Sequence, residues 1–372
     1  MKHHNQNQLI FFFPIFEIGG VEKNFFIISD FFTRKLINYN FNLITYENSY
    51  LIKKNLNRKI NLITSKFISF LLPRRIKFLL CMIMLIIKCI KKPNSVIFSF
   101  QGNFYALLVA YILGKKIIVR SNLSPDAWSK NQFKKIIFKF LLSKSNMIIV
   151  NSFEFKKKFK EYFNLNVTKI FNPISIKDIN INKKLKFKDN FFKKNTINII
   201  NIGRLVVQKN QSEIINALYN VKNKNKLRLL IFGNGPEKKN LVKIIKKKKL
   251  NKIVKILDNQ KAKFFYLRKS DIFVLSSLYE GLPNVLLEAA ITKKYIVSSD
   301  CPTGPREIIK IYKYGEIYKL KSVNQLTNIF RKLSLNKNIL KKLKKNINLN
   351  NIMFDSDYNL NQYYLNFIKA IN

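Results

Sequence analysis

The stretch Tyr279-Glu-Gly-Leu-Pro-Asn-Val-Leu-Leu-Glu-Ala-Ala290 places two carboxylates, Glu280 and Glu288, around a predicted junction between a strand and a helix. The apolar run 271–277 before it predicts a buried parallel strand, and the pattern of 284–292 predicts a helix. In open α/β folds such a junction lies at the carboxyl edge of the sheet, where anionic groups bind. The stretch therefore predicts a parallel α/β fold with a ligand site at this edge.

The loop between the two carboxylates offers backbone groups to a ligand. Gly281 lets the backbone approach a ligand closely, and Pro283 suits the first turn of a helix because it lacks an N–H. A single glutamate here would indicate only that it complements the helix dipole. The whole segment favours a binding site, at which we expect Gly281, Leu282, Pro283, Asn284 and Val285.

Length and composition favour a globular chain of two domains. The chain has 372 residues, of which 47% are hydrophobic, enough for two separate cores. The three cysteines show neither a disulfide framework nor a metal-ligand spacing, and the two histidines, His3 and His4, lie next to the N-terminus. A histidine-based catalytic base or metal site is therefore not expected.

The formal charge of +49 points to anionic partners. Lysine is interspersed with asparagine, isoleucine and phenylalanine along the whole chain, without a nucleic-acid-binding motif. Part of the charge thus reflects compositional bias, and we expect no specific nucleic-acid partner. The remaining charge favours an anionic membrane surface. The apolar stretch 78–88, with basic residues on both sides within 74–92, predicts either a buried helix or a helix on a membrane surface.

Apolar strand-like runs alternate with helical patterns along the chain, which predicts doubly wound parallel sheets. The expected strands are 8–13, 42–46, 60–64, 95–100, 116–120 and 147–150, then 196–202, 227–232, 253–257, 272–275 and 295–298. Asn172 and Pro173 interrupt the first series, and a lysine-rich stretch follows as the expected linker. The predicted domains are 1–173 and 174–356, followed by a helical segment at 357–372.

A second group of candidate site residues follows the first strand of the second domain. Gly203 permits a sharp turn, and Arg204 and Lys209 lie five residues apart across the loop into the next helix. Two cations beside a helix N-terminus suit a diphosphate, arginine by forked hydrogen bonds and lysine as a point charge. Gly233 ends the next strand in a glycine-rich turn.

These motifs resemble those of the retaining nucleotide-sugar glycosyltransferases of family 4, among the group 1 glycosyltransferases. The resemblance rests on Glu280 and Glu288 with seven residues between them, and on Gly203-Arg204 followed by Lys209. It implies the α/β GT-B architecture, in which two Rossmann-like βαβ domains face a central cleft. It also implies a C-terminal helix that crosses back to the first domain, which binds the acceptor, while the second domain binds the donor.

The same resemblance assigns roles to individual residues. Glu280, Arg204 and Lys209 would be catalytic, with Glu280 at the donor-sugar hydroxyls and the two cations at the diphosphate. Glu288 would bind the ribose, and the 281–285 loop would hold sugar and phosphate. Gly203, Gly233 and Asn259 would complete the donor site, where backbone groups near Asn259 hold the base.

Four residues are expected on the acceptor side. Gly19 and Gly20 follow the first strand and resemble the acceptor-side loop of the family, although a tight turn alone also explains them. Many relatives carry a histidine near 120–125, which this chain lacks, so Ser121 and Asn122 are the candidates there. Ordinary turn and cap chemistry explains these two residues equally well.

The resulting hypothesis is a metal-independent hexosyltransferase-type enzyme without a cofactor. It would move a sugar from a UDP- or GDP-linked donor, with retention, to a lipid-linked or polysaccharide acceptor in bacterial surface-glycan synthesis, of the lipopolysaccharide, capsule or O-antigen type. The enzyme would be cytoplasmic and peripheral at the inner face of the cytoplasmic membrane. The alternative is a catalytically inactive GT-B protein that binds nucleotide sugars or serves as a scaffold.

Overall fold

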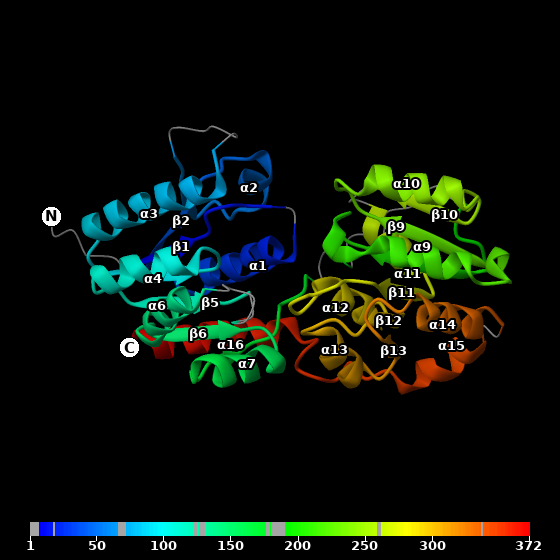
Figure 1. The fold of residues 1–372 in the computed structure, drawn as a ribbon. Helices are drawn as coiled ribbons and strands as arrows, with labels where there is room; N and C mark the ends of the chain where they lie inside the picture. Colours follow the sequence, from blue (N-terminus) through cyan, green and yellow to red (C-terminus); the bar gives the residue numbers. More distant parts are fainter. Residues whose placement is uncertain are drawn as a thin grey trace. The chain divides into compact units, whose positions relative to one another are not determined.

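The computed structural model describes residues 7–17, 19–65, 72–122, 125, 131–175, 179, 190–258, 262–335 and 338–372. The chain divides into two compact units (Figure 1): the first comprises Met1–Pro173 and Ser356–Asn372, and the second comprises Ile174–Asp355. Each unit is built on one sheet in which every recorded strand pair is parallel. The expected α/β class with two Rossmann-like units is confirmed.

The first unit contains a sheet of order β3-β2-β1-β4-β5-β6-β7. Its strands are β1 (Asn7–Phe12), β2 (Tyr39–Ile44), β3 (Ile60–Ile63), β4 (Ser95–Ser99), β5 (Ile117–Arg120), β6 (Met147–Val150) and β7 (Thr168–Lys169). Its helices are α1 (Gly20–Lys35), α2 (Tyr50–Asn55), α3 (Arg74–Lys91), α4 (Asn103–Ile112), α6 (Gln132–Ser143), α7 (Phe153–Phe163) and α16 (Ser356–Ile371). The sequence patterns predicted neither β7 nor α2.

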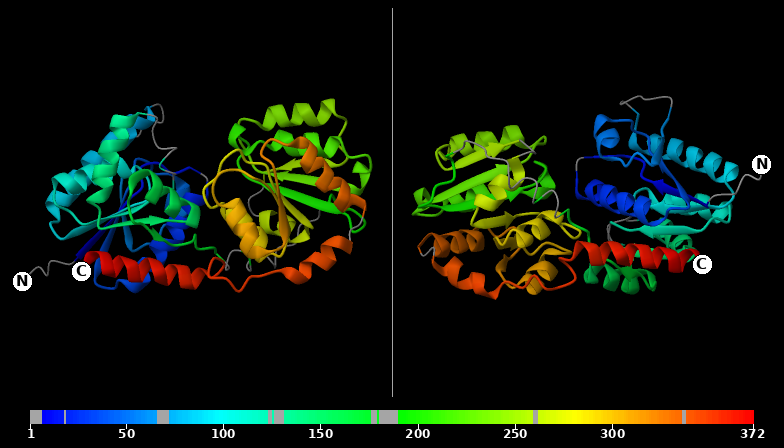
Figure 2. Two further views of the ribbon diagram at one scale, coloured as in Figure 1. Left: turned by 60° about the horizontal axis from the view of Figure 1, so that its bottom comes forward. Right: turned by 180° about the vertical axis from the view of Figure 1, so that it is seen from behind.

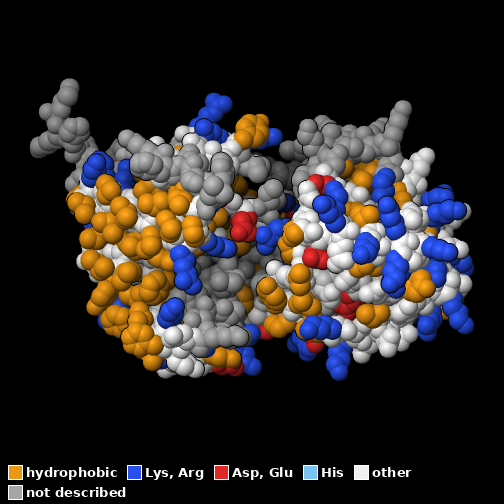
Figure 3. All heavy atoms as spheres, turned by 45° about the horizontal axis from the view of Figure 1, so that its top comes forward, with side chains coloured by type: hydrophobic (Ala, Val, Ile, Leu, Met, Phe, Trp, Pro, Cys, Tyr) orange, Lys and Arg blue, Asp and Glu red, His pale blue; other side chains and the backbone are white. Residues whose placement is uncertain are grey.

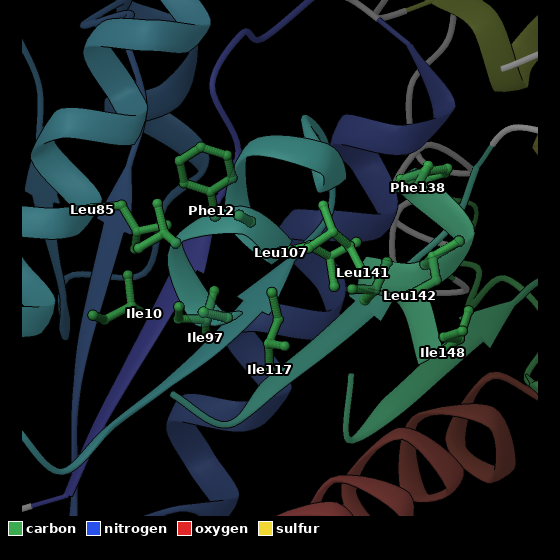
Figure 4. Packing of buried hydrophobic residues seen from close by; sticks show 14 of the residues in the cluster. Ile10, Phe12, Leu85, Ile97, Leu107, Ile117, Phe138, Leu141, Leu142 and Ile148 are labelled. Atoms are coloured by element: carbon green, nitrogen blue, oxygen red, sulfur yellow. The ribbon is translucent and has the colours of Figure 1, made fainter. Parts of the chain in front are cut away.

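The core of the first unit lies on both faces of this sheet. Because successive side chains of a strand point to opposite faces, β1 sends Ile10 and Phe12 to one face and Leu9 and Phe11 to the other. Helices α3, α4, α6 and α7 cover the first face, and Figure 4 shows apolar side chains of α3, α4 and α6 next to those of the strands. Helices α1, α2 and α16 cover the second face.

Helix α16 is tied to the first unit although the chain reaches it through the second. It contacts α1 (Figure 2), and the rings of Phe32 and Phe367 meet edge to face with centroids 5.1 Å apart. The Nε of Arg120, a residue only 1% exposed, donates to the Tyr363 hydroxyl over 2.9 Å. A buried guanidinium thus joins the end of β5 to the C-terminal helix.

Helix α3 corresponds to the apolar and basic segment 74–92. Its buried side chains are Cys81, Leu85 and Cys89. Of the two alternatives for this segment, the buried helix therefore describes one face only. The opposite face carries large apolar side chains in solvent. Among the described helices, none is long and apolar enough to cross a membrane.

The second unit contains a sheet of order β10-β9-β8-β11-β12-β13. Its strands are β8 (Ile197–Ile202), β9 (Leu227–Phe232), β10 (Val254–Leu257), β11 (Ile272–Leu275), β12 (Tyr295–Ser299) and β13 (Gly315–Tyr318). Its helices are η1 (Val207–Lys209), α9 (Gln211–Tyr219), η2 (Lys224–Lys226), α10 (Lys238–Lys247), α11 (Lys263–Lys269), α12 (Asn284–Ile291), α13 (Pro305–Tyr312), α14 (Val323–Leu335), α15 (Asn338–Leu343) and η4 (Lys344–Asn346). The sequence patterns did not predict β13, α14 or α15.

Strand order reverses between β8 and β11, which are neighbours in the second sheet. From β8 the chain builds outward through β9 and β10, then returns to the other side of β8 to place β11. A crevice at the carboxyl ends of two such strands is the usual ligand site of open α/β folds. The loops after β8 and β11 are therefore the expected position of a ligand site.

Candidate active site of the second unit

The loops after β8 and β11 bring Lys209 and Glu280 together. Lys209 ends η1, and its Nζ lies 2.5 Å from Oε1 of Glu280. The two side chains are 17% and 8% exposed, so the pair is largely shielded from water. Ser277 Oγ donates to the same carboxylate oxygen over 2.5 Å. Two residues assigned separate roles from sequence thus form one charged unit at the strand reversal.

Backbone contacts hold η1 against the segment after β11. The Leu278 N–H donates to the Gln208 carbonyl over 2.8 Å, and the Gln208 side-chain amide donates to the Tyr279 carbonyl over 2.8 Å. Ser276 Oγ donates to the Lys209 carbonyl, also over 2.8 Å. These bonds fix the backbone on both sides of the ion pair, so its geometry does not depend on the two charged side chains alone.

A third loop, after β12, holds the backbone of Glu280. The Glu280 N–H donates to the Pro302 carbonyl over 3.3 Å, and the Thr303 hydroxyl donates to the Glu280 carbonyl. Gly304 has a φ of +89°, and a Cβ there would lie 2.2 Å from the Gly281 carbonyl oxygen. Only glycine allows the two loops to approach this closely.

The remaining residues of the predicted 280–288 stretch surround the start of α12. The helix begins at Asn284 with Pro283 as its N-cap, so proline precedes the first turn instead of occupying it. Leu282 is buried, while Gly281, Asn284 and Val285 are not fully buried. The Leu286 N–H donates to the Pro283 carbonyl over 3.0 Å.

Glu288 lies in α12 and is buried against α11. Its carboxylate forms an ion pair with the Lys263 ammonium, and the two side chains are 6% and 7% exposed. A carboxylate and an ammonium this deeply buried must compensate each other, because an unpaired charge there is costly. Sequence reasoning missed Lys263, since one lysine in a chain with 69 lysine and arginine residues carries no signal.

Gly203 and Gly233 allow the loops after β8 and β9 to touch. The Gly203 N–H donates to the Phe232 carbonyl over 3.0 Å, and a Cβ on Gly233 would lie 1.9 Å from the Gly203 carbonyl oxygen. Gly233 therefore serves the contact between the loops. Arg204 is exposed next to Gly203. Asn259 lies outside the described residues.

The first unit places the four acceptor-side candidates at the carboxyl edge of its own sheet. Gly19 is the N-cap of α1, and Gly20 is its first residue. Ser121 and Asn122 follow β5, where the Asn122 side-chain amide donates to the Phe100 carbonyl over 2.8 Å and its Oδ1 accepts from Arg120. The buried guanidinium that holds α16 thus also orients Asn122, a link absent from the sequence reasoning.

Titratable groups around the ion pair are shifted by burial. Burial raises the pKa of the Cys301 thiol to about 12, and the Glu280 carboxylate adds to this shift. Cys301 therefore stays a neutral thiol near neutral pH and does not offer a nucleophile. Within the described part of the chain, no group of three or more His, Cys, Asp or Glu side chains is placed to hold a metal ion.

Glu213, in the first turn of α9, is a buried carboxyl group next to the turn of Lys209. It is 4% exposed, and its Oε2 accepts from Asn210 Nδ2 over 2.6 Å. Burial raises its pKa from 4.5 to about 7, although the bond from Asn210 acts in the opposite direction. The folded protein thus holds this proton at a pH where the unfolded chain has lost it.

We expect Glu213→Gln to remove a pH dependence of stability. For the parent protein, the free energy of unfolding should fall as pH rises from about 4.5 to about 7, because the unfolded chain releases the proton first. Thermal unfolding should therefore show the variant more stable than the parent by about 2–3 kcal/mol at pH 8, with little difference at pH 4.5. Asp258→Asn, at an exposed position, serves as the control. If stability depended on pH in the same way in both variants, the raised pKa assigned to Glu213 would be contradicted.

The fold matches solved structures, and part of the sequence matches a known family. The chain matches the structure of HepE from Anabaena in complex with UDP and glucose, with a TM-score of 0.73 at 15% identity, covering 98% of this chain and 100% of that one. This likeness concerns the fold, which is GT-B. Residues 182–349, which lie within the second unit, match the family Glycosyl transferases group 1.

Two relatives share parts of the sequence. An uncharacterized glycosyltransferase of Methanocaldococcus jannaschii is 32% identical over 237 residues, which cover 59% of this chain and 58% of the relative. The N-acetylgalactosamine-N,N'-diacetylbacillosaminyl-diphospho-undecaprenol 4-alpha-N-acetylgalactosaminyltransferase of Campylobacter jejuni is 27% identical over 242 residues, 62% of this chain and 64% of the relative. The chain thus spans less than two thirds of the length of either relative.

Proposed function

We propose that the protein transfers a sugar from a nucleoside-diphosphate donor to a lipid-linked or polysaccharide acceptor in the synthesis of a cell-surface glycan. The observation that carries the proposal is the Lys209–Glu280 pair at the strand reversal of a group 1 glycosyl transferase domain. The name of the Campylobacter relative supports an acceptor linked to diphospho-undecaprenol, and the Anabaena structure with UDP supports a uridine donor. A lipid-linked acceptor would place the protein at the inner face of the cytoplasmic membrane.

The reaction requires that negative charge on the leaving group be stabilised. When the bond between the sugar and the diphosphate breaks, negative charge grows on the departing phosphate oxygens. Lys209 and the exposed Arg204 would stabilise that charge in the place of a divalent cation. Lys209 is held by Glu280 before the donor arrives, so its position requires little reorganisation.

Glu280 would orient the sugar in this scheme. Its Oε1 already accepts from Ser277 and pairs with Lys209, which leaves Oε2 for hydroxyl groups of the donor. Glu288 would bind the ribose, and the 281–285 loop would contact sugar and phosphate. We further propose that the new glycosidic bond keeps the configuration of the donor.

The proposal is tested by donor turnover in the presence of a chelator. The full chain is mixed with UDP- or GDP-sugars and polyprenyl-diphosphate-linked acceptors, and we expect release of nucleoside diphosphate that needs the acceptor and persists in EDTA. NMR of the product should show the anomeric configuration of the donor. A requirement for Mg²⁺ or Mn²⁺ would contradict the metal-free scheme. Tight donor binding without transfer to any acceptor would favour the inactive binding protein.

A further inference from the structure

Three helices of the first unit carry an unusual apolar surface. Helices α3, α4 and α6 cover one face of the sheet, and α4 contacts both of the others. Each turns apolar side chains into the core and others into solvent. Figure 3 shows hydrophobic side chains gathered over a broad face of this unit. The exposed set, each member at least 41% exposed, consists of Ile76, Leu79, Ile83, Ile87, Ile90, Tyr111, Ile112, Phe133, Ile136 and Phe140. We call it the α3–α4–α6 surface.

The spacing of these residues arranges them in stripes along the helices. Those of α3 recur every three or four residues, which is one stripe along the helix. Phe133, Ile136 and Phe140 form a second stripe on α6. Tyr111 of α4 meets Phe140 edge to face, with ring centroids 5.4 Å apart, and so joins α4 to α6. Soluble monomers rarely expose an apolar area of this extent without a partner.

The charges around the surface specify the kind of partner. Helix α3 contains five lysine or arginine residues, α6 contains three, and none of the three helices contains an acidic residue. Arg74 and Arg75 occupy the first turn of α3, where the helix dipole disfavours cations. Arg74 has an exposed pair with Glu17, with 3.6 Å between the charged groups.

The other end of α3 gathers positive charge. Lys88, Lys91 and Lys92 lie together, and burial, followed by repulsion from Lys92 and Lys91, lowers the pKa of Lys88. An anionic layer over this end would relieve the repulsion. Apolar side chains that can enter acyl chains, flanked by cations that meet head groups, are the composition of a helix face lying in a membrane interface.

We propose that the α3–α4–α6 surface docks the protein on the face of an anionic lipid bilayer. Its apolar side chains enter the boundary between head groups and acyl chains, and the lysine and arginine residues contact acidic head groups. The proposal rests only on the residues of the α3–α4–α6 surface. Its test is therefore independent of the transfer reaction proposed for the second unit. A protein partner or a second copy of this chain would be alternative occupants.

The test is binding of the full chain to vesicles. We expect co-sedimentation with vesicles of phosphatidylcholine and phosphatidylglycerol, weakened by added salt, and little with phosphatidylcholine alone. Replacing Ile87, Ile90, Phe133 and Ile136 by serine should lower the partition coefficient by about 100-fold, because those side chains no longer enter the bilayer. All four are exposed, so the fold should persist, which circular dichroism checks.

A matched control separates this surface from exposed apolar residues in general. Ile37 and Leu365 are 85% and 57% exposed, and they belong to the α1 and α16 side of the same unit. Ile37→Ser with Leu365→Ser should leave vesicle binding within about twofold of the parent. Equal losses for both variants, or none for the fourfold variant, would overturn the proposal. The proposal would also be overturned if sedimentation velocity showed a dimer of the parent that only the fourfold variant converts to a monomer. The surface would then be an interface between copies of this chain. UDP binding, measured separately, should be unchanged in every variant.

Discussion

Lys209→Met should lower kcat/KM for the nucleotide sugar by a factor of about 10² to 10³. The substitution keeps most of the side-chain volume but removes the ammonium group that would face the developing charge on the diphosphate. It also leaves Glu280, whose side chain is 8% exposed, without its cationic partner. Steady-state kinetics with a saturating acceptor, together with the dissociation constant for UDP, give the measurement.

Two controls distinguish lost catalysis from lost structure. Lys247→Met removes the same charge from an exposed position on α10 and should leave kcat/KM within about twofold of the parent. Lys209→Met with Glu280→Gln removes both charges, so it should recover the melting temperature without recovering turnover. If the double variant regains activity, the loss in the single variant reflects an unpaired carboxylate, and Lys209 has no role at the diphosphate.

The sequence predicted most of the strands in both units. The apolar runs of the second unit are largely buried parallel strands, and five of its six strands fall where the pattern predicts them. The strand β13 was missed because Gly315–Tyr318 is short and mixes polar with apolar residues. Glu280, Arg204 and Lys209 could be selected because glycine and strand ends give them a recognisable setting. Their roles remain predictions.

Contacts that depend on packing could not be predicted in the same way. Lys263 is separated from Glu288 by 25 positions, and the two meet only because the fold brings these side chains of α11 and α12 together. Glu213 has an ordinary place in the first turn of α9, where an acid complements the helix dipole. Its burial, and hence its raised pKa, follows from neighbours distant in sequence. The exposed stripe of α3 could not be predicted either. An apolar run predicts burial, but it does not show which side of the helix faces the core.

Lys263→Met should lower the free energy of unfolding by about 3–5 kcal/mol, the largest stability effect we expect from a single substitution in the second unit. The variant keeps the volume of the side chain but leaves the Glu288 carboxylate buried without its partner, since the two are 7% and 6% exposed. Urea unfolding of the full chain, followed by circular dichroism, gives the measurement.

The second unit also offers an exposed ion pair as a matched control. Lys332 and Glu316 lie 3.9 Å apart with side chains 55% and 28% exposed, so Lys332→Met should cost less than about 1 kcal/mol. Lys263→Met with Glu288→Leu replaces the buried pair by apolar groups and should recover most of the stability. If Glu288 binds the ribose, this stable double variant should bind UDP weakly, whereas Lys332→Met should bind it normally. Equal losses of stability for Lys263→Met and Lys332→Met would show that burial does not strengthen the Lys263–Glu288 pair.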